Sequence, residues 1–180
     1  MTYSSKYKNI SCLKLAVLCV FLCTKISFGQ KDVSSTSKVQ SIFDRFMRYR
    51  HQNKVDKALE TLDEAAEIAE NNEDAKLLLD TYHQYARLFL EEGNRETTIF
   101  YWDRASILLK DLSYPYGQAF HDYLEAAIRF DEGNNFQALK LLEESRKLSN
   151  NRNLGNNILL LEGYIFTNIT NYEDAIKNLH

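Results

Sequence analysis

Apolar residues recur along residues 39–180 with the four-then-three spacing that marks one face of a helix. Four segments carry this pattern, and each is followed by a turn and by a second apolar segment. The four stripes are Ile42, Phe46 and Tyr49; Tyr82, Ala86 and Phe89; Tyr123, Ala127 and Phe130; and Leu159, Gly163 and Phe166. In the last three the middle residue is small, which allows a neighbouring backbone to approach closely. The pattern predicts four pairs of helices.

The second helix of each pair repeats its own pattern in a common register. A small residue stands five positions after the start of the turn, and a bulky residue follows four positions later. The small residues are Ala58, Thr98, Ala138 and Ala175, spaced by 40, 40 and 37 residues, and the bulky ones are Leu62, Trp102, Leu142 and Leu179. Such a period is typical of helical repeat proteins. The sequence therefore predicts an all-α fold, with turns at Asn53, Gly93 and Gly133 and a last, incomplete second helix beginning near Tyr172.

The order of a large, a small and an aromatic residue, then a Gly-Asp-Tyr-like turn and an alanine, resembles the tetratricopeptide repeat (TPR) family. The closest unit is Leu159, Gly163, Phe166 and "NYEDA", and the resemblance covers residues 39–180. It implies an α-solenoid of antiparallel helix pairs with about four repeats. The units are longer than is usual for the family and resemble the arrays of bacterial signalling proteins. An irregular helical bundle is the alternative.

The resemblance also implies a concave groove lined by the first helix of each pair. The positions that point into this groove are Phe43, Met47 and Arg50; Asp80, His83 and Arg87; and Leu160, Tyr164 and Asn168. Glu91 and Asn157 belong to the same set, and the third helix would add His121, Leu124 and Ile128. The Lys and Asn clamp of chaperone-binding members is absent, so an extended peptide or a helix of a partner protein is the expected ligand.

The first 29 residues have the order of a secretory signal peptide. Three lysines precede the apolar run "LAVLCVFLC" at 15–23, and the small residues Ser27 and Gly29 follow it. The run is shorter than the roughly 20 residues of a membrane span. We expect export to the periplasm or cell envelope with cleavage near Gly29; an uncleaved anchor and a buried helix are the alternatives. The polar residues 30–38 predict a linker.

Composition and motifs give no support for chemistry. The net charge of −3 does not favour a nucleic-acid partner. All three cysteines lie in residues 1–29, and no pair of histidines has the i, i+4 spacing of a helical metal site, so no metal and no cofactor are expected. His83 and His121 are expected to lie near each other on adjacent first helices. No catalytic motif is present, and the chain is predicted not to be an enzyme.

These patterns predict a non-enzymatic module that binds a protein or peptide ligand. The favoured setting is the N-terminal sensing or scaffolding part of a bacterial signalling protein, such as a sensor kinase or transcriptional regulator, with a membrane-anchored module downstream. A stand-alone envelope scaffold is the alternative. Because the last predicted helix is short, we also expect the native chain to continue beyond His180.

Overall fold

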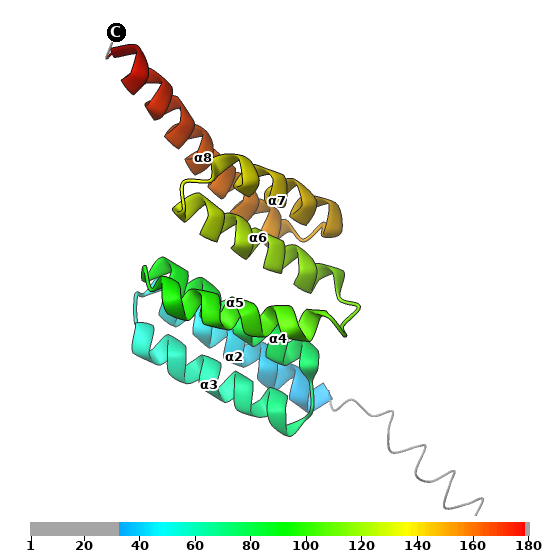
Figure 1. Ribbon diagram of the computed structural model, residues 1–180. Coiled ribbons are helices and arrows are strands. Elements are labelled where there is room, and N and C mark those ends of the chain that lie inside the picture. The colour runs from blue at the N-terminus through cyan, green and yellow to red at the C-terminus, as the bar shows by residue number, and fades with distance from the viewer. Residues whose placement is uncertain (1–32, 179–180) are drawn as a thin grey trace, which may run out of the picture. The chain divides into compact units, whose positions relative to one another are not determined.

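The protein was analysed as a computed structural model that describes the backbone of residues 33–178 and the side chains of residues 38–171. The chain divides into two units, residues 1–41 and 42–180. Within the described range all regular structure is helical, which confirms the all-α prediction (Figure 1). The helices are α2 (Val33–His51), α3 (Val55–Asn71), α4 (Ala75–Glu91), α5 (Arg95–Leu109), α6 (Pro115–Asp131), α7 (Asn135–Leu148) and α8 (Arg152–Asn178). The predicted signal peptide lies outside the described residues, and among those described no helix is long and apolar enough to cross a membrane.

The start of α2 corrects one prediction. Residues 30–38 were expected to form a linker because they are polar, but the helix already begins at Val33. The stretch "VSSTSK" contains neither glycine nor proline, and serine and threonine cost a helix only a few tenths of a kcal/mol each, about 0.7 at most. Polarity alone therefore did not distinguish a linker from the first turns of a helix.

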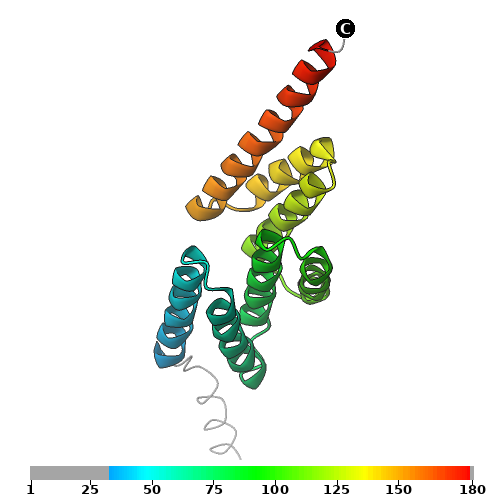
Figure 2. The same ribbon diagram turned by 90° about the vertical axis from the view of Figure 1, so that its left-hand side faces the viewer.

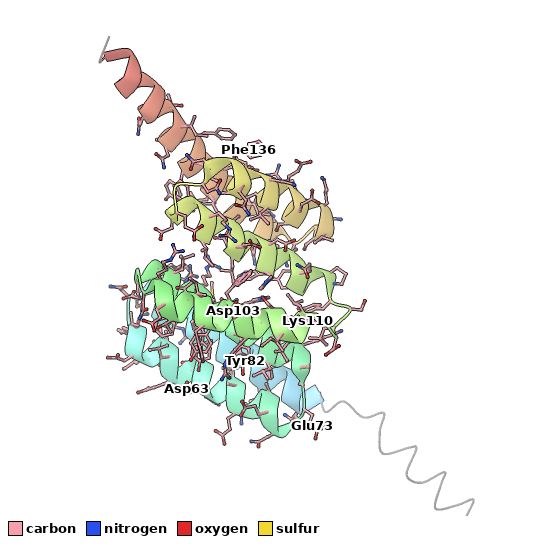
Figure 3. All side chains as sticks on the ribbon, in the orientation of Figure 1. Asp63, Glu73, Tyr82, Asp103, Lys110 and Phe136 are labelled. Atoms are coloured by element: carbon pink, nitrogen blue, oxygen red, sulfur yellow. The ribbon has the colours of Figure 1, made fainter. Side chains whose placement is uncertain are left out.

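One type of turn joins successive helices at four places. Its central residue has a positive φ, and the next backbone N–H donates to a carbonyl five residues back, as in a Schellman motif. The central residues are Asn53 (φ 54°), Glu73 (φ 51°), Gly93 (φ 69°) and Gly133 (φ 77°), and the corresponding N–H···O distances are 2.9, 2.8, 2.8 and 2.8 Å. The turns at Asn53, Gly93 and Gly133 were predicted from the residue type. The turn at Glu73, labelled in Figure 3, was not predicted, because glutamate rarely adopts this conformation.

The side chain after each of three turns caps the next helix. Asp74, Asn94 and Asn134 each accept a hydrogen bond from a backbone N–H in the first turn, at 3.1, 3.2 and 3.4 Å. Helix α6 begins differently, with Pro115 in its first turn, a position that proline favours. The turns leave α4 packed on α5 and α6 packed on α7 (Figure 1).

The small residues of the second helices lie in the core, as their register predicts. Ala58, Thr98 and Ala138 have no exposed surface. Phe46, Ala58 and Leu62 form a cluster with residues of α4, and a second cluster extends from α4 to α8. Tyr85 on α4 also donates a hydrogen bond to Asp63 on α3, a residue labelled in Figure 3.

The stripe of α6 is shifted by one residue from the prediction. Ala126 is completely buried, whereas Ala127 is only partly buried. Ser145 on α7 donates a hydrogen bond to the carbonyl of Ala119 at 2.6 Å, so α7 covers the face that carries Ala119 and Ala126. Ala126 and Ala127 are both small enough for the middle position of the stripe. Only the contact with α7 shows that Ala126 is the residue at that position.

Helix α8 contradicts the predicted fourth pair. It runs without interruption from Arg152 to Asn178, through the position at which a turn was expected. The hydroxyl groups of Thr167 and Thr170 donate to the carbonyls of Gly163 and Phe166 at 2.8 and 2.9 Å, the bonding pattern of a helix interior. The segment "NITNYEDA" contains two asparagines, the residue type that forms the turn at Asn53, yet here the helix continues.

The continuation of α8 changes which of its faces is buried. Leu154, Ile158, Leu161 and Ile165 lie in the core, while the predicted inner stripe of Leu159, Gly163 and Phe166 is exposed. Ile165 and Ile169 still pack on the core, and the last turns of α8 extend past α6 and α7 (Figures 1 and 2). The predicted stripe is therefore helical, and no helix of residues 33–178 covers it.

Candidate binding face on α2, α4, α6 and α8

Three helices that are distant in sequence meet at one polar cluster. Arg50 on α2 donates two hydrogen bonds to the carboxylate of Glu91 at the end of α4, at 2.7 and 2.6 Å. Arg87, one turn before Glu91, contacts the same carboxylate at 3.2 Å and donates to Asn157 of α8 at 3.4 Å. We call Arg50, Arg87, Glu91 and Asn157 the arginine cluster. The packing therefore brings side chains of α2, α4 and α8 together.

The arginine cluster contains two guanidinium groups and one carboxylate. The side chains of Arg50 and Arg87 are 12% and 14% exposed, whereas that of Glu91 is 41% exposed. Burial opposes the ionisation of Glu91, but the hydrogen bonds and charges of the two arginines outweigh it and lower the pKa of Glu91. Within this cluster one positive charge has no carboxylate of its own, and a guanidinium group binds a carboxylate in bidentate geometry.

Two tyrosines of α6 lie near the arginine cluster. Burial raises the pKa of Tyr123, whose phenol also senses the charges of Arg87, Glu91 and Arg50. Burial likewise raises the pKa of Tyr116, which lies within the fields of Asp80 and Arg87. Neither tyrosine was predicted for the groove, and Tyr123 was missed because the third helix was read one residue out of register. Counting back from Gly133 as from Gly93 would have placed Tyr123 at the position of His83.

Asp80, a predicted groove residue, is a largely buried carboxyl group near the start of α4. It accepts a hydrogen bond from the hydroxyl of Tyr114 at 3.1 Å. Burial raises its pKa to about 6, and the bond from Tyr114 offsets only part of that effect. Asp80 thus lies two helical turns before Arg87 on the same helix, and the charges of both residues act on the phenol of Tyr116.

The apolar residues predicted for the groove differ in exposure. Phe43 and Met47 of α2 are half-buried against the cluster around Phe46, and the sulfur of Met47 lies 3.7 Å from a guanidinium nitrogen of Arg50. Leu160 and Tyr164 of α8 are 58% and 56% exposed. One side of α8 carries four residues at helical spacing: Asn157, Leu160, Tyr164 and Asn168. Asn157, the first of them, is the residue that Arg87 contacts.

His83 does not line an open surface, which corrects its predicted role. It is only 1% exposed, and its ring packs on Phe120 and on His121. The nearest nitrogens of His83 and His121 are 3.3 Å apart, so the predicted proximity of the two histidines is confirmed. The bulky neighbours of α6 bury this position of α4, whereas the groove prediction considered only the helix that carries it.

The second histidine links α6 to α5. His121 lies 2.9 Å from the hydroxyl of Ser106, and Trp102 stacks on its ring with a centroid distance of 4.5 Å. Burial lowers the pKa of His83 to about 3 and that of His121 to about 4, so both are neutral at pH 7. The two histidines are enclosed by side chains and lie in the core between α4, α5 and α6. Their position indicates a structural role.

In the part of the chain whose side chains are described, no three histidine, cysteine or acidic residues are grouped as metal ligands. Comparison of the chain with protein-family models, with curated proteins and with solved structures found no match.

Proposed function

We propose that this chain is a non-enzymatic helical-repeat module of TPR type that binds an acidic, partly apolar peptide segment of another protein. The binding face is formed by the arginine cluster together with Phe43, Met47, Tyr123, Leu160 and Tyr164. The observation that carries the proposal is the arginine cluster: α2, α4 and α8 contribute to one site in which two guanidinium groups share the carboxylate of Glu91.

The proposed mode of binding follows from the neighbours of the cluster. A carboxylate of the ligand would take hydrogen bonds from Arg50 or Arg87, whose donors are already oriented by Glu91 and Asn157. Apolar side chains of the same segment would lie along Leu160 and Tyr164, which are exposed on α8. Orientation of the donors before binding reduces the entropy lost on binding and so favours affinity.

The test starts from peptides selected from a random library against the full chain. The variant Arg50→Gln/Arg87→Gln should weaken their binding by about tenfold or more, since a hydrogen bond to a charged group contributes roughly 1.5–3 kcal/mol. Arg95→Gln/Arg129→Gln is the matched control, because those two arginines also share one carboxylate, that of Glu132, at an exposed site. Binding would be measured by fluorescence anisotropy of labelled peptides, with circular dichroism to check the fold.

Selected peptides that bind the Arg50→Gln/Arg87→Gln variant as tightly as the unchanged chain would rule out the proposed face. Loss of binding in the control variant instead would place the site at the turn near Glu132. The wider setting is part of the proposal: an exported sensing region of a signalling protein, with a stand-alone envelope scaffold as the alternative. A membrane span and a kinase or DNA-binding module encoded downstream would favour the first.

A further inference from the structure

The face of α4 that contributes to the arginine cluster carries a carboxyl group at its other end. Asp80 and Arg87 are seven residues apart, which places them on the same side of α4, about 10 Å from each other along the helix axis. The charges of both act on the phenol of Tyr116, which places this residue of α6 near both. Two turns later on α6, the phenol of Tyr123 senses Arg87 and Glu91. The face therefore has an acidic end as well as a basic end, and tyrosines of α6 border both.

The carboxyl group of Asp80 has a neutral hydrogen-bond partner and no ion pair within the described part of the chain. The hydroxyl of Tyr114 donates to its Oδ2 atom at 3.1 Å. Lys76, one turn earlier, holds its ammonium group over the ring of Tyr114, 5.3 Å from the centroid, rather than on Asp80. Asp74 also acts on Asp80, with a charge of the same sign. The Oδ1 atom accepts no hydrogen bond from the residues whose side chains are described and retains accessible surface, so it is available to a further donor.

Glu91, at the end of the same helix, shows what a cation does to a partly buried carboxyl group. Burial opposes the ionisation of both Asp80 and Glu91. At Glu91 two arginines outweigh this effect and lower the pKa, whereas at Asp80 the bond from Tyr114 offsets only part of it and the pKa is raised to about 6. A carboxylate that has lost water without gaining a counter-charge is stabilised by a cation that approaches it. Asp80 therefore lacks the kind of partner that Glu91 has.

We infer that Asp80 is a second anchor of the peptide-binding face and binds a lysine or arginine side chain of the ligand. The inference rests on the proposed function, because it names the chemistry of the same ligand. The ammonium or guanidinium group donates to Oδ1 of Asp80 while Tyr114 keeps its bond to Oδ2. The rings of Tyr114 and Tyr116, whose centroids are 5.9 Å apart, give this end of the face aromatic surfaces that attract a cation.

The separation of the two anchors restricts the sequence of the ligand. An extended peptide advances about 3.3 Å per residue, so about three residues span the distance of about 10 Å between Arg87 and Asp80. The expected ligand is a segment in which an acidic residue and a basic residue are about three positions apart. A segment with acidic residues alone would satisfy the arginine cluster but would leave Asp80 without a counter-charge.

A double-mutant cycle between the chain and its ligand tests this contact. Peptides selected from a random library against the full chain should contain a lysine or arginine about three positions from an acidic residue. Asp80→Asn keeps an acceptor for Tyr114. This variant, and replacement of the basic residue of the peptide by glutamine, should each weaken binding by about fivefold or more, and the two changes together should weaken it little further. Fluorescence anisotropy at pH 8, where Asp80 is ionised, would measure each affinity.

Asp122→Asn is the matched control for the loss of a partly buried carboxyl group. Burial also raises the pKa of Asp122, and a neutral side chain, that of Gln118, donates to it at 2.7 Å. Asp122 senses the charge of Glu144 on α7 and not those of the arginine cluster, so it lies away from the binding face. This variant should bind the selected peptides as tightly as the unchanged chain does.

Selected peptides that lack a basic residue at this spacing would overturn the inference, as would equal affinity of Asp80→Asn and the unchanged chain. Weakening by Asp122→Asn as strong as by Asp80→Asn would also overturn it, because the effect would then not depend on the position of the carboxyl group. The same peptides are measured with Arg50→Gln/Arg87→Gln. Peptides that depend on the arginines but not on Asp80 refute the second anchor alone, and peptides that depend on Asp80 but not on the arginines refute the arginine cluster alone.

Discussion

Replacement of the turn glycines by alanine should destabilise the protein through the backbone alone. Gly93 and Gly133 have φ of 69° and 77°, and a Cβ added at either would meet no atom within 4 Å. A steric clash with neighbours is therefore absent, and the left-handed backbone conformation is the only source of strain. Few substitutions in a packed protein isolate one physical effect so well.

The expected magnitude combines two opposing effects. An L-residue with a side chain loses about 1–2 kcal/mol in the left-handed region. Alanine also restricts the unfolded chain, which returns about 0.4–1 kcal/mol. Gly93→Ala and Gly133→Ala should each lower the free energy of unfolding by about 1 kcal/mol. At Glu73, where φ is 51°, the signs reverse, so Glu73→Gly should raise the free energy of unfolding by a similar amount.

Urea denaturation followed by far-ultraviolet circular dichroism would measure these changes as shifts of the midpoint at constant slope. A change of 1 kcal/mol corresponds to a shift of about 2–4 °C in Tm for a chain of this size. Gly155→Ala is the control, because that glycine lies inside α8 with no atom within 4 Å of an added Cβ. Alanine there should stabilise the helix by about 0.5–1 kcal/mol. Hydrogen exchange at the α4–α5 turn would localise the effect of Gly93→Ala.

The reasoning would be refuted if Gly93→Ala and Gly133→Ala left stability unchanged or raised it. That result would mean that the turns adopt another conformation in solution. A loss of stability in Glu73→Gly would refute the reversed sign in the same way.

Two further predictions concern buried titratable groups. The pKa values of His83 and His121 are lowered by burial to about 3 and about 4, so the unfolded chain binds protons first as the pH falls. The free energy of unfolding should therefore decrease below about pH 6.5, by about 2 kcal/mol per histidine at pH 5. Denaturation series at several pH values would measure this decrease. The pKa of Asp80 is raised to about 6 by burial, so its stabilising contribution is complete below its unfolded pKa and is lost as the pH rises through 6. Asp80→Asn should therefore be more stable than the unchanged chain at pH 8, by about 1–3 kcal/mol, with the difference vanishing near pH 4; an equal difference at both pH values would contradict this account.

Local signals in the sequence were sufficient for the helices and for most of their turns. Gly93 and Gly133 supply the positive φ that the turns need, and the small residues Ala58 and Ala138 are buried as their register predicts. Each of these is a short-range property: a backbone preference, or the spacing of residues on one helix face. From Val33 onward the expected linker is a helix instead, because serine and threonine are polar but do not prevent a helix.

The sequence alone could not choose between alternatives that satisfy the same local rule. Ala126 and Ala127 are both small, and the contact of Ser145 with the carbonyl of Ala119 shows which of their faces α7 covers. His83 has the groove spacing, yet the bulk of Phe120 and His121 on α6 buries it. These outcomes depend on the volume and position of a neighbouring helix, and the residue pattern of a single helix contains no information about either.

The arginine cluster shows the same division most clearly. The repeat register placed Arg50, Arg87, Glu91 and Asn157 at groove positions one helix at a time. Only the packing of α2, α4 and α8 brings two guanidinium groups to one carboxylate and leaves them 12% and 14% exposed. The sequence by itself determined which faces of the helices are apolar and where most of them end. The tertiary structure decided which faces meet and which charges share a partner, and it left the stripe of α8 uncovered, because those outcomes depend on distances between residues that are remote along the chain.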